Sequence, residues 1–285
     1  MTYNNQETAM EARKPFLLPD NISNDFSDEE LEEDYEGLNQ KIQRVKIPGG
    51  GTVQFEFPGS DPDNPEYAKT LEGVILYNHP ASAYWPEGSD YDDNVAPLCS
   101  SVDGKTGYGE PGGSCELCPW NKYGTGTDSK GNPSKGKACK NMRHLYLLQS
   151  GAYLPVLLAL PPTSLKSFNE FMNVAFIARR RPTWGSVVQI SLRKIENGAN
   201  TYSVASFKKL YDFEGEQLAQ VKRCAGTFRE QIKKMLLERA IAAESSNEPD
   251  QLYEADANYK VIEDGRHFSI SAPDVIDGER EELPA

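Results

Sequence analysis

A chain of 285 residues with 38% hydrophobic and 10% aromatic residues can form one large folded domain or two small ones. No apolar run approaches the roughly 20 residues that a membrane helix needs, which argues against a membrane-spanning protein or a membrane partner. The N-terminal residues lack the basic and apolar regions of a secretory signal, so we expect a cytoplasmic location.

The net charge of −13 is unevenly distributed along the chain. Residues 1–38 hold 11 acidic and 2 basic side chains, and residues 244–285 hold 12 acidic and 3 basic ones. The body between them, residues 39–243, holds 20 acidic and 25 basic side chains and is therefore mildly basic. We expect an acidic N-terminal arm that is disordered or weakly helical and an acidic C-terminal tail that is disordered. The charge of the body between them suits a polyanionic partner.

The body begins with a β pattern. Residues 42–47 and 52–57 alternate apolar and polar side chains around a Pro-Gly-Gly-Gly turn, which predicts a hairpin, and residues 73–77 predict a short strand. Residues 145–148 and 154–160 predict a second hairpin, and residues 187–195 and 202–210 a third. In the C-terminal tail, residues 259–262 and 267–270 are strand-like.

Two segments show helical periodicity. One begins at a cap on Thr163 or Ser164 and runs to about residue 179, and the other spans about residues 215–243. The order of elements predicts a mainly β protein with two helices (α+β), compatible with an OB-like β-barrel that carries an insertion at about residues 78–143. Other small β-barrels share this order.

The insertion lacks periodicity but contains four of the five cysteines: Cys99, Cys115, Cys118 and Cys139. A loop of this length needs something to organise it, and the C-x-x-C pair with two flanking cysteines is typical of a structural Zn²⁺ site with four thiolate ligands. The alternatives are four reduced thiols, a redox C-x-x-C pair, or a site in which His144 replaces one cysteine. Cys224 is expected to be a small packing residue.

Basic and aromatic residues interleave in and around the insertion. Proteins that bind single strands combine a cationic path for the phosphates with aromatic rings for the bases. This pattern predicts a single-stranded DNA interface, with these candidate contacts: Tyr84, Trp85, Trp120, Lys122, Tyr123, Lys135, Lys137, Lys140, Arg143, Tyr146, Arg179, Arg180, Arg181, Trp184, Arg193 and Lys194.

Each candidate also has a structural alternative. The lysine- and glycine-rich loop could be a solvated surface, and Trp120 and Tyr123 could only shield the zinc ion. The arginine triplet 179–181 could complement the dipole of the helix that it ends.

The cysteine frame, with the segments C-S-S-x-D-G, C-x-x-C-P-W-N-x-x-G, G-K-A-C-K-N-x-R-x-L-Y-L-L and L-P-P-T-S-L, resembles a set of phage and prophage proteins regarded as replication-associated DNA-binding proteins. The likeness covers roughly residues 73–175. The plan of the chain is also similar to zinc-containing phage helix-destabilising proteins, in which an OB fold carries a metal subdomain and an acidic C-terminal tail. The resemblance implies the four cysteines as ligands, whereas those proteins can use a histidine, and it implies the cytoplasm of a host cell.

The sequence contains no H-E-x-x-H motif, no deaminase motif and no Walker loop, so we expect no enzyme. The expected function is non-catalytic: protecting and organising single-stranded DNA in replication or recombination, with the acidic tail recruiting protein partners. The alternative is a zinc-knuckle protein-interaction factor, a phage transcription or recombination accessory protein without intrinsic affinity for single strands.

Overall fold

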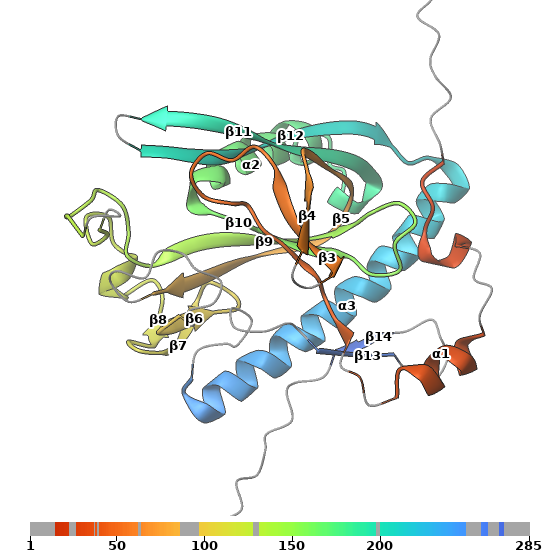
Figure 1. The fold of residues 1–285 in the computed structure, drawn as a ribbon, viewed down its shortest axis with the longest axis horizontal. Helices are drawn as coiled ribbons and strands as arrows, with labels where there is room; N and C mark the ends of the chain where they lie inside the picture. Colours follow the sequence, from red (N-terminus) through yellow and green to blue (C-terminus); the bar gives the residue numbers. More distant parts are fainter. Residues whose placement is uncertain are drawn as a thin grey trace, which may run out of the picture.

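The structure is a computed structural model that describes residues 15–22, 27–36, 38, 40–61, 64–85, 97–127, 131–197, 200–248, 258–261 and 268–270. It is a mainly β protein with two long helices, which confirms the α+β class (Figure 1). The helices are α1 (Asp28–Asp34), α2 (Pro162–Met172) and α3 (Gly215–Ser246). The strands are β1 (Gln40–Lys41), β2 (Arg44–Val45), β3 (Phe55–Asp61), β4 (Asn64–Ala68), β5 (Thr70–Tyr84), β6 (Cys99–Ser101), β7 (Thr106–Gly109), β8 (Gly113–Ser114), β9 (Lys140–Leu148), β10 (Val156–Leu160), β11 (Ser186–Asn197), β12 (Asn200–Asp212), β13 (Asn258–Val261) and β14 (Phe268–Ile270).

The central strand is β5, which is 15 residues long. One of its edges pairs with β9, which pairs with β10, and β10 pairs in parallel with β2. The other edge is shared: its first residues pair with β11, and its last residues pair with β6 of the insertion. The strand pairing of the described residues forms an open sheet, so a closed OB-like barrel is not shown.

The two long helices cover opposite faces of this sheet. Side chains alternate between the faces along a strand, so in β9 Tyr146 and Leu148 pack with α3, whereas Leu145 and Leu147 pack on the side of α2. The α3-side core includes Val221, Phe228 and Ile232 of α3, and the α2-side core includes Phe168 of α2. All five residues of β10 are apolar and buried, because both faces of this strand are covered.

The sequence predicted the second and third hairpins correctly. They are β9–β10 and β11–β12, with antiparallel registers along their lengths. The first predicted hairpin is only partly formed, because Lys46 and Glu56 make a single bridge while β2 pairs with β10 and β3 pairs with β4. Pairing with β10 places Val45 in the α2-side core, which local pairing with β3 would not achieve by itself.

Helix α2 begins one residue earlier than its predicted cap. Pro161 occupies the N-cap position, with Pro162 in the first turn, where its missing N–H costs no hydrogen bond. The Ser164 hydroxyl is buried and accepts a hydrogen bond from the Ala205 N–H of β12 at 2.9 Å. The cap prediction was therefore wrong, because this serine joins the helix to the sheet.

The insertion is shorter than predicted, since β5 extends to Tyr84 and β9 begins at Lys140. Its described part carries β6, β7 and β8 and a short 3-10 turn, Pro119–Asn121. In the acidic N-terminal arm, α1 begins with a capping box between Ser27 and Glu30. Phe16 and Leu18 of the same arm are buried in the α3-side core, so the prediction of disorder was wrong for this part of the arm. In the tail, β13 pairs with β1 and β14. Residues 1–14, 23–26, 37, 249–257, 262–267 and 271–285 of the two acidic segments lie outside the described part. No described helix has the length and apolarity needed to cross a membrane.

Candidate functional site

All four cysteines of the insertion line one small cavity of about 10 Å³. Cys99 begins β6, Cys115 follows β8, Cys118 precedes the Pro119–Asn121 turn, and Cys139 immediately precedes β9. Residues that are 40 positions apart in the sequence therefore meet at one point. The cavity is about as large as the space that one water molecule needs, which suits a single ion.

Backbone and side-chain contacts shape this cavity. A Cβ atom on Gly107 would lie 2.9 Å from the Cys99 Sγ and 3.7 Å from the Cys115 Sγ, so glycine leaves room for the sulfur atoms. The Asn121 amide donates to the Cys115 carbonyl oxygen at 2.6 Å, and the Asn121 N–H donates to the Cys118 carbonyl oxygen at 3.1 Å. The Cys139 N–H donates to the Trp120 carbonyl oxygen at 2.9 Å, which closes the loop.

The thiols influence one another electrostatically. Burial raises the pKa of Cys99 and of Cys115, and it raises the pKa of Cys139 to about 12. Neighbouring cysteines contribute to each of these increases in pKa, because adjacent thiolates repel one another. A divalent cation at the centre would reverse this repulsion, because a metal-bound thiol loses its proton. The chemistry of the four sulfurs therefore fits a Zn²⁺ ion.

Within the described residues, no three His, Cys, Asp or Glu side chains have the mutual geometry to hold a metal ion, and the four cysteines form no disulfide with one another. His144 is not among the residues that line the cavity. It is fully buried in β9, edge-on to His79 at 5.1 Å between ring centroids, in a register that places the two histidines opposite each other. The structure thus favours four cysteines over a set that includes His144.

A large groove lies beside the insertion, with a volume of about 1340 Å³. One wall comes from β2 and the loop after it, a second from residues 136–142 and Tyr123, and a third from α2 with Tyr202 and Ser203 of β12. Five basic and two acidic side chains line it: Arg44, Lys46, Lys137, Lys140, Lys166, Glu56 and Glu170. Cys139 lines both the groove and the cysteine cavity, so the two sites share a wall.

The insertion carries exposed aromatic rings, of which Tyr123 lines the groove. Tyr123 is 82% exposed, and the Lys137 Nζ lies 5.1 Å from the centre of its ring. Trp120 is 38% exposed and stacks on Tyr84, with ring centroids 5.5 Å apart and planes 7° apart. The arrangement of a cation over one ring and a supported second ring resembles the stacking platforms of single-strand binders.

The structure places the predicted contacts in several different environments. Tyr123, Lys137 and Lys140 line the groove, and Tyr84 with Trp120 forms the adjacent stack. Lys122 and Lys135 are exposed on the insertion. Arg143 is half-buried and donates through its Nε to the Asn78 Oδ1 at 2.8 Å, while its guanidinium lies 6.0 Å from the Phe168 ring. Arg193 and Lys194 are exposed on β11, where Lys194 pairs with Glu196 at 2.7 Å.

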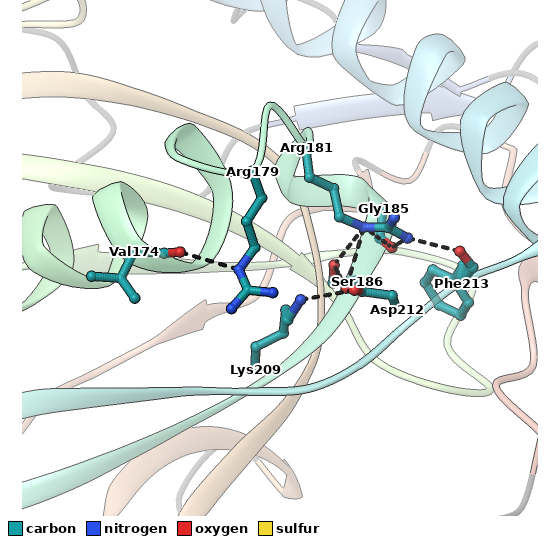
Figure 2. A network of polar contacts seen from close by, with 8 residues as sticks. All are labelled: Val174, Arg179, Arg181, Gly185, Ser186, Lys209, Asp212 and Phe213. Carbon is teal, nitrogen blue, oxygen red and sulfur yellow. Dashed lines mark hydrogen bonds and ion pairs between the residues drawn. The ribbon is translucent and has the colours of Figure 1, made fainter.

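Four predicted contacts are corrected by their burial or bonding. Tyr146 and Trp85 are buried in the α3-side core, and Trp184 packs against it, because β-strand alternation and the first turn after α2 direct these rings inward. Arg181 donates to the carbonyl oxygens of Gly185 and Phe213 at 2.6 and 2.7 Å and pairs with Asp212 at 3.2 Å (Figure 2). These four side chains therefore hold the fold together.

Sequence reasoning missed several groove residues. Arg44 lies in β2, and Lys46 is the bridge residue directly after this strand. The two are separated by one residue, so the alternation of a strand already indicated a basic face. Lys166 and Asn169 lie on one side of α2, at a helical spacing that could have been recognised. Tyr202 reaches the groove only through the β11–β12 hairpin, and no local pattern indicates it.

Tertiary geometry is therefore the main guide to this site. It joins a cysteine cavity to a cationic groove through the shared wall at Cys139. Comparison with known proteins finds no matching family model, no similar curated protein and no similar solved structure.

Proposed function

We propose that this protein is a non-catalytic, zinc-containing single-stranded DNA-binding protein of phage type, with the DNA strand lying in the groove between α2, the loop after β2 and the insertion. The observation that carries the proposal is the shared wall: the same segment that ends in Cys139 supplies Lys137 and Lys140 to the groove. Zn²⁺ bound by Cys99, Cys115, Cys118 and Cys139 would hold that wall in place. The ion would have a structural role, since four thiolates leave no position for a reacting water.

Groove size and charge support a flexible polyanion as the ligand. The volume of about 1340 Å³ exceeds the roughly 300–1,000 Å³ of typical small-molecule pockets. The surplus of three positive charges along the walls suits phosphates, and the two ion pairs there, Lys46–Glu56 and Lys166–Glu170, are long at 3.8 and 4.0 Å. Tyr123 and the Trp120–Tyr84 stack would receive bases.

The rest of the chain completes the proposal. The open sheet with its insertion would correspond to the OB-like part of phage helix-destabilising proteins, in the cytoplasm of a host cell. The acidic C-terminal tail, residues 244–285, would recruit replication or recombination proteins. Its negative charge is opposite to that of the groove and repels other polyanions. Protection and organisation of single strands would be the outcome.

A titration with fluorescein-labelled oligo-dT tests this function. The wild-type protein should bind with an affinity that falls steeply as salt rises, because each phosphate contact contributes about 0.7 to the slope for single strands. The Lys137→Gln/Lys140→Gln variant should lose about 1.4 from that slope if both lysines contact phosphates. The control is Lys222→Gln/Lys233→Gln, which removes two exposed lysines from α3 on the opposite face of the sheet. Absence of oligo-dT binding at low salt by zinc-loaded protein would refute the proposal.

A second candidate is a zinc-knuckle protein-interaction factor that acts in transcription or recombination. Leu117, between the two cysteines of the C-x-x-C pair, is strongly exposed, and Leu98 beside Cys99 is exposed as well. Exposed leucines next to a rigid knuckle suit contact with another protein. Failure of oligo-dT binding together with Leu117-dependent capture of a replication protein would favour this candidate.

A further inference from the structure

The side of α2 that lines the groove continues beyond the end of the groove. Lys166, Asn169, Glu170 and Asn173 line it at spacings of three and four residues, so they share one side of the helix. A turn of π-helix, Asn173–Ile177, follows directly, and the Ala178 N–H donates to the Asn173 carbonyl oxygen. Val174 lies four residues after Glu170 and Ile177 lies four residues after Asn173, and the turn that holds Arg179 and Arg180 follows directly.

Two exposed arginines stand at this end. Arg181 is held inward by Gly185, Phe213 and Asp212 (Figure 2). Its two predecessors, Arg179 and Arg180, are exposed. Arg180 adopts a left-handed backbone conformation with φ of +50°. The chain therefore turns sharply between the exposed Arg179 and the anchored Arg181. The Arg179 Nε donates only to the Val174 carbonyl oxygen, at 3.4 Å.

The nearby carboxylate does not neutralise these arginines. Asp212 pairs with Arg181 at 3.2 Å and with Lys209 at 2.8 Å, and the Ser186 hydroxyl donates to it at 2.6 Å. Among the described residues, neither Arg179 nor Arg180 forms an ion pair with a carboxylate. Beside them, Val174 and Ile177 are 69% and 63% exposed. The surface formed by Val174, Ile177, Arg179 and Arg180, which we name the arginine tip, thus combines two cations with two apolar side chains.

We propose that the arginine tip is an exit site at which a single strand leaving the groove along α2 is held by its phosphates, with bases resting on Val174 and Ile177. This inference rests on the proposed function, since it needs a strand in the groove. The occupant is argued from charge: planar guanidinium groups bind phosphate through paired hydrogen bonds, and the tip lies at the end of the groove wall. The two sites would act in series on one polynucleotide.

A length series of oligo-dT, from about 4 to about 16 nucleotides, tests the exit site over the range that single-strand binding folds occupy. The Arg179→Gln/Arg180→Gln variant should bind the shortest oligonucleotides with the same affinity as the wild type, provided that the wild type binds them measurably. It should bind the longest about tenfold more weakly, and its salt slope on them should fall by about 1.4. The Val174→Ser/Ile177→Ser variant should show a smaller loss that is again confined to long oligonucleotides. The matched control, Lys222→Gln/Arg223→Gln, should bind every length as the wild type does.

Each outcome separates this inference from the proposed function. Equal affinity of the wild type and of Arg179→Gln/Arg180→Gln for long oligonucleotides overturns the exit site. Binding of short oligonucleotides in the same experiment would still support the groove as the DNA site. Equal loss at all lengths also overturns it, because the arginines would then act within the groove. Loss of binding to a partner protein in these variants, with unchanged DNA binding, would identify the tip as a protein-docking surface instead. Absence of any oligo-dT binding by the wild type removes the groove and the exit site together.

Discussion

Trp120 of the insertion stacks on Tyr84 of the central strand, with ring centroids 5.5 Å apart and planes 7° apart. This contact joins the cysteine-bearing insertion to the last residue of β5, and Tyr84 also lines the cysteine cavity. One face of the indole is covered by the tyrosine ring, and 38% of the residue is still exposed. The pair can therefore support a third, stacked ring without first ordering Trp120.

Replacement of Trp120 by alanine should weaken binding of oligo-dT without unfolding the protein. Stacking of a base contributes about 1–3 kcal/mol, so the loss should be between about 5-fold and 150-fold, and Trp120→Phe should retain most of the affinity. Tryptophan fluorescence gives the measurement, since oligo-dT should quench Trp120. Quenching should disappear in Trp120→Phe and persist in the control Trp184→Phe, whose ring packs against the α3-side core. Undiminished quenching in Trp120→Phe would contradict the stacking role.

Replacement of Cys118 by serine should release zinc and loosen the insertion, because folding and metal binding are coupled when the metal supplies the organising contacts. Hydrogen exchange should accelerate at least about tenfold in residues 97–127 and 131–139, while β10 and the buried part of β9 keep their protection. Metal content by atomic emission should fall from one zinc per chain. The control Cys224→Ser should keep its zinc, because Cys224 packs against the α3-side core. Full zinc content in Cys118→Ser would exclude this residue as a ligand.

Replacement of Arg181 by glutamine should reduce the free energy of unfolding by at least about 1.5 kcal/mol, since a hydrogen bond from a charged donor is worth about 1.5–3 kcal/mol and Arg181 donates to two backbone carbonyl groups. Urea denaturation measures the change. Its neighbour Arg180 is exposed, so Arg180→Ala should change stability by no more than about 0.5 kcal/mol. Equal effects of the two substitutions would show that the anchoring of Arg181 is not what stabilises this turn.

Acid should destabilise the protein through its buried histidines. Burial, with smaller contributions from Arg143 and Arg239, lowers the pKa of His79 to about 4. Burial, with smaller contributions from His79, Arg44 and Arg239, also lowers the pKa of His144. Unfolded histidines take up protons near pH 6.5, so below that pH the unfolded state binds more protons than the folded state.

The histidines should therefore leave the free energy of unfolding nearly constant above about pH 7.5 and decrease it as the pH falls through 6.5 towards 4, by at most about 1.4 kcal/mol per pH unit for each histidine. Urea unfolding between pH 8 and pH 4 measures the slope. His79→Gln should remove about half of it. Asp103 and Asp212, whose pKa values are lowered, stabilise the fold at neutral pH and lose this effect as the pH falls through and below the ordinary carboxylate range, near pH 4 and lower. A flat profile from pH 6.5 to 4.5 would contradict this account of the buried pair.

Sequence alone determined the β9–β10 and β11–β12 hairpins, the two long helices and the cysteine frame. These features depend on local periods, since strands repeat every two residues and helices every 3.6, and on the short C-x-x-C spacing. Only the tertiary structure decided which polar and aromatic residues meet. The three arginines at 179–181 have the same chemistry, yet the backbone turn at Arg180 directs Arg181 into bonds with Gly185 and Phe213 and leaves the other two exposed. Likewise, the groove joins β2, α2, β12 and the insertion, because sheet pairing brings together segments that share no local pattern.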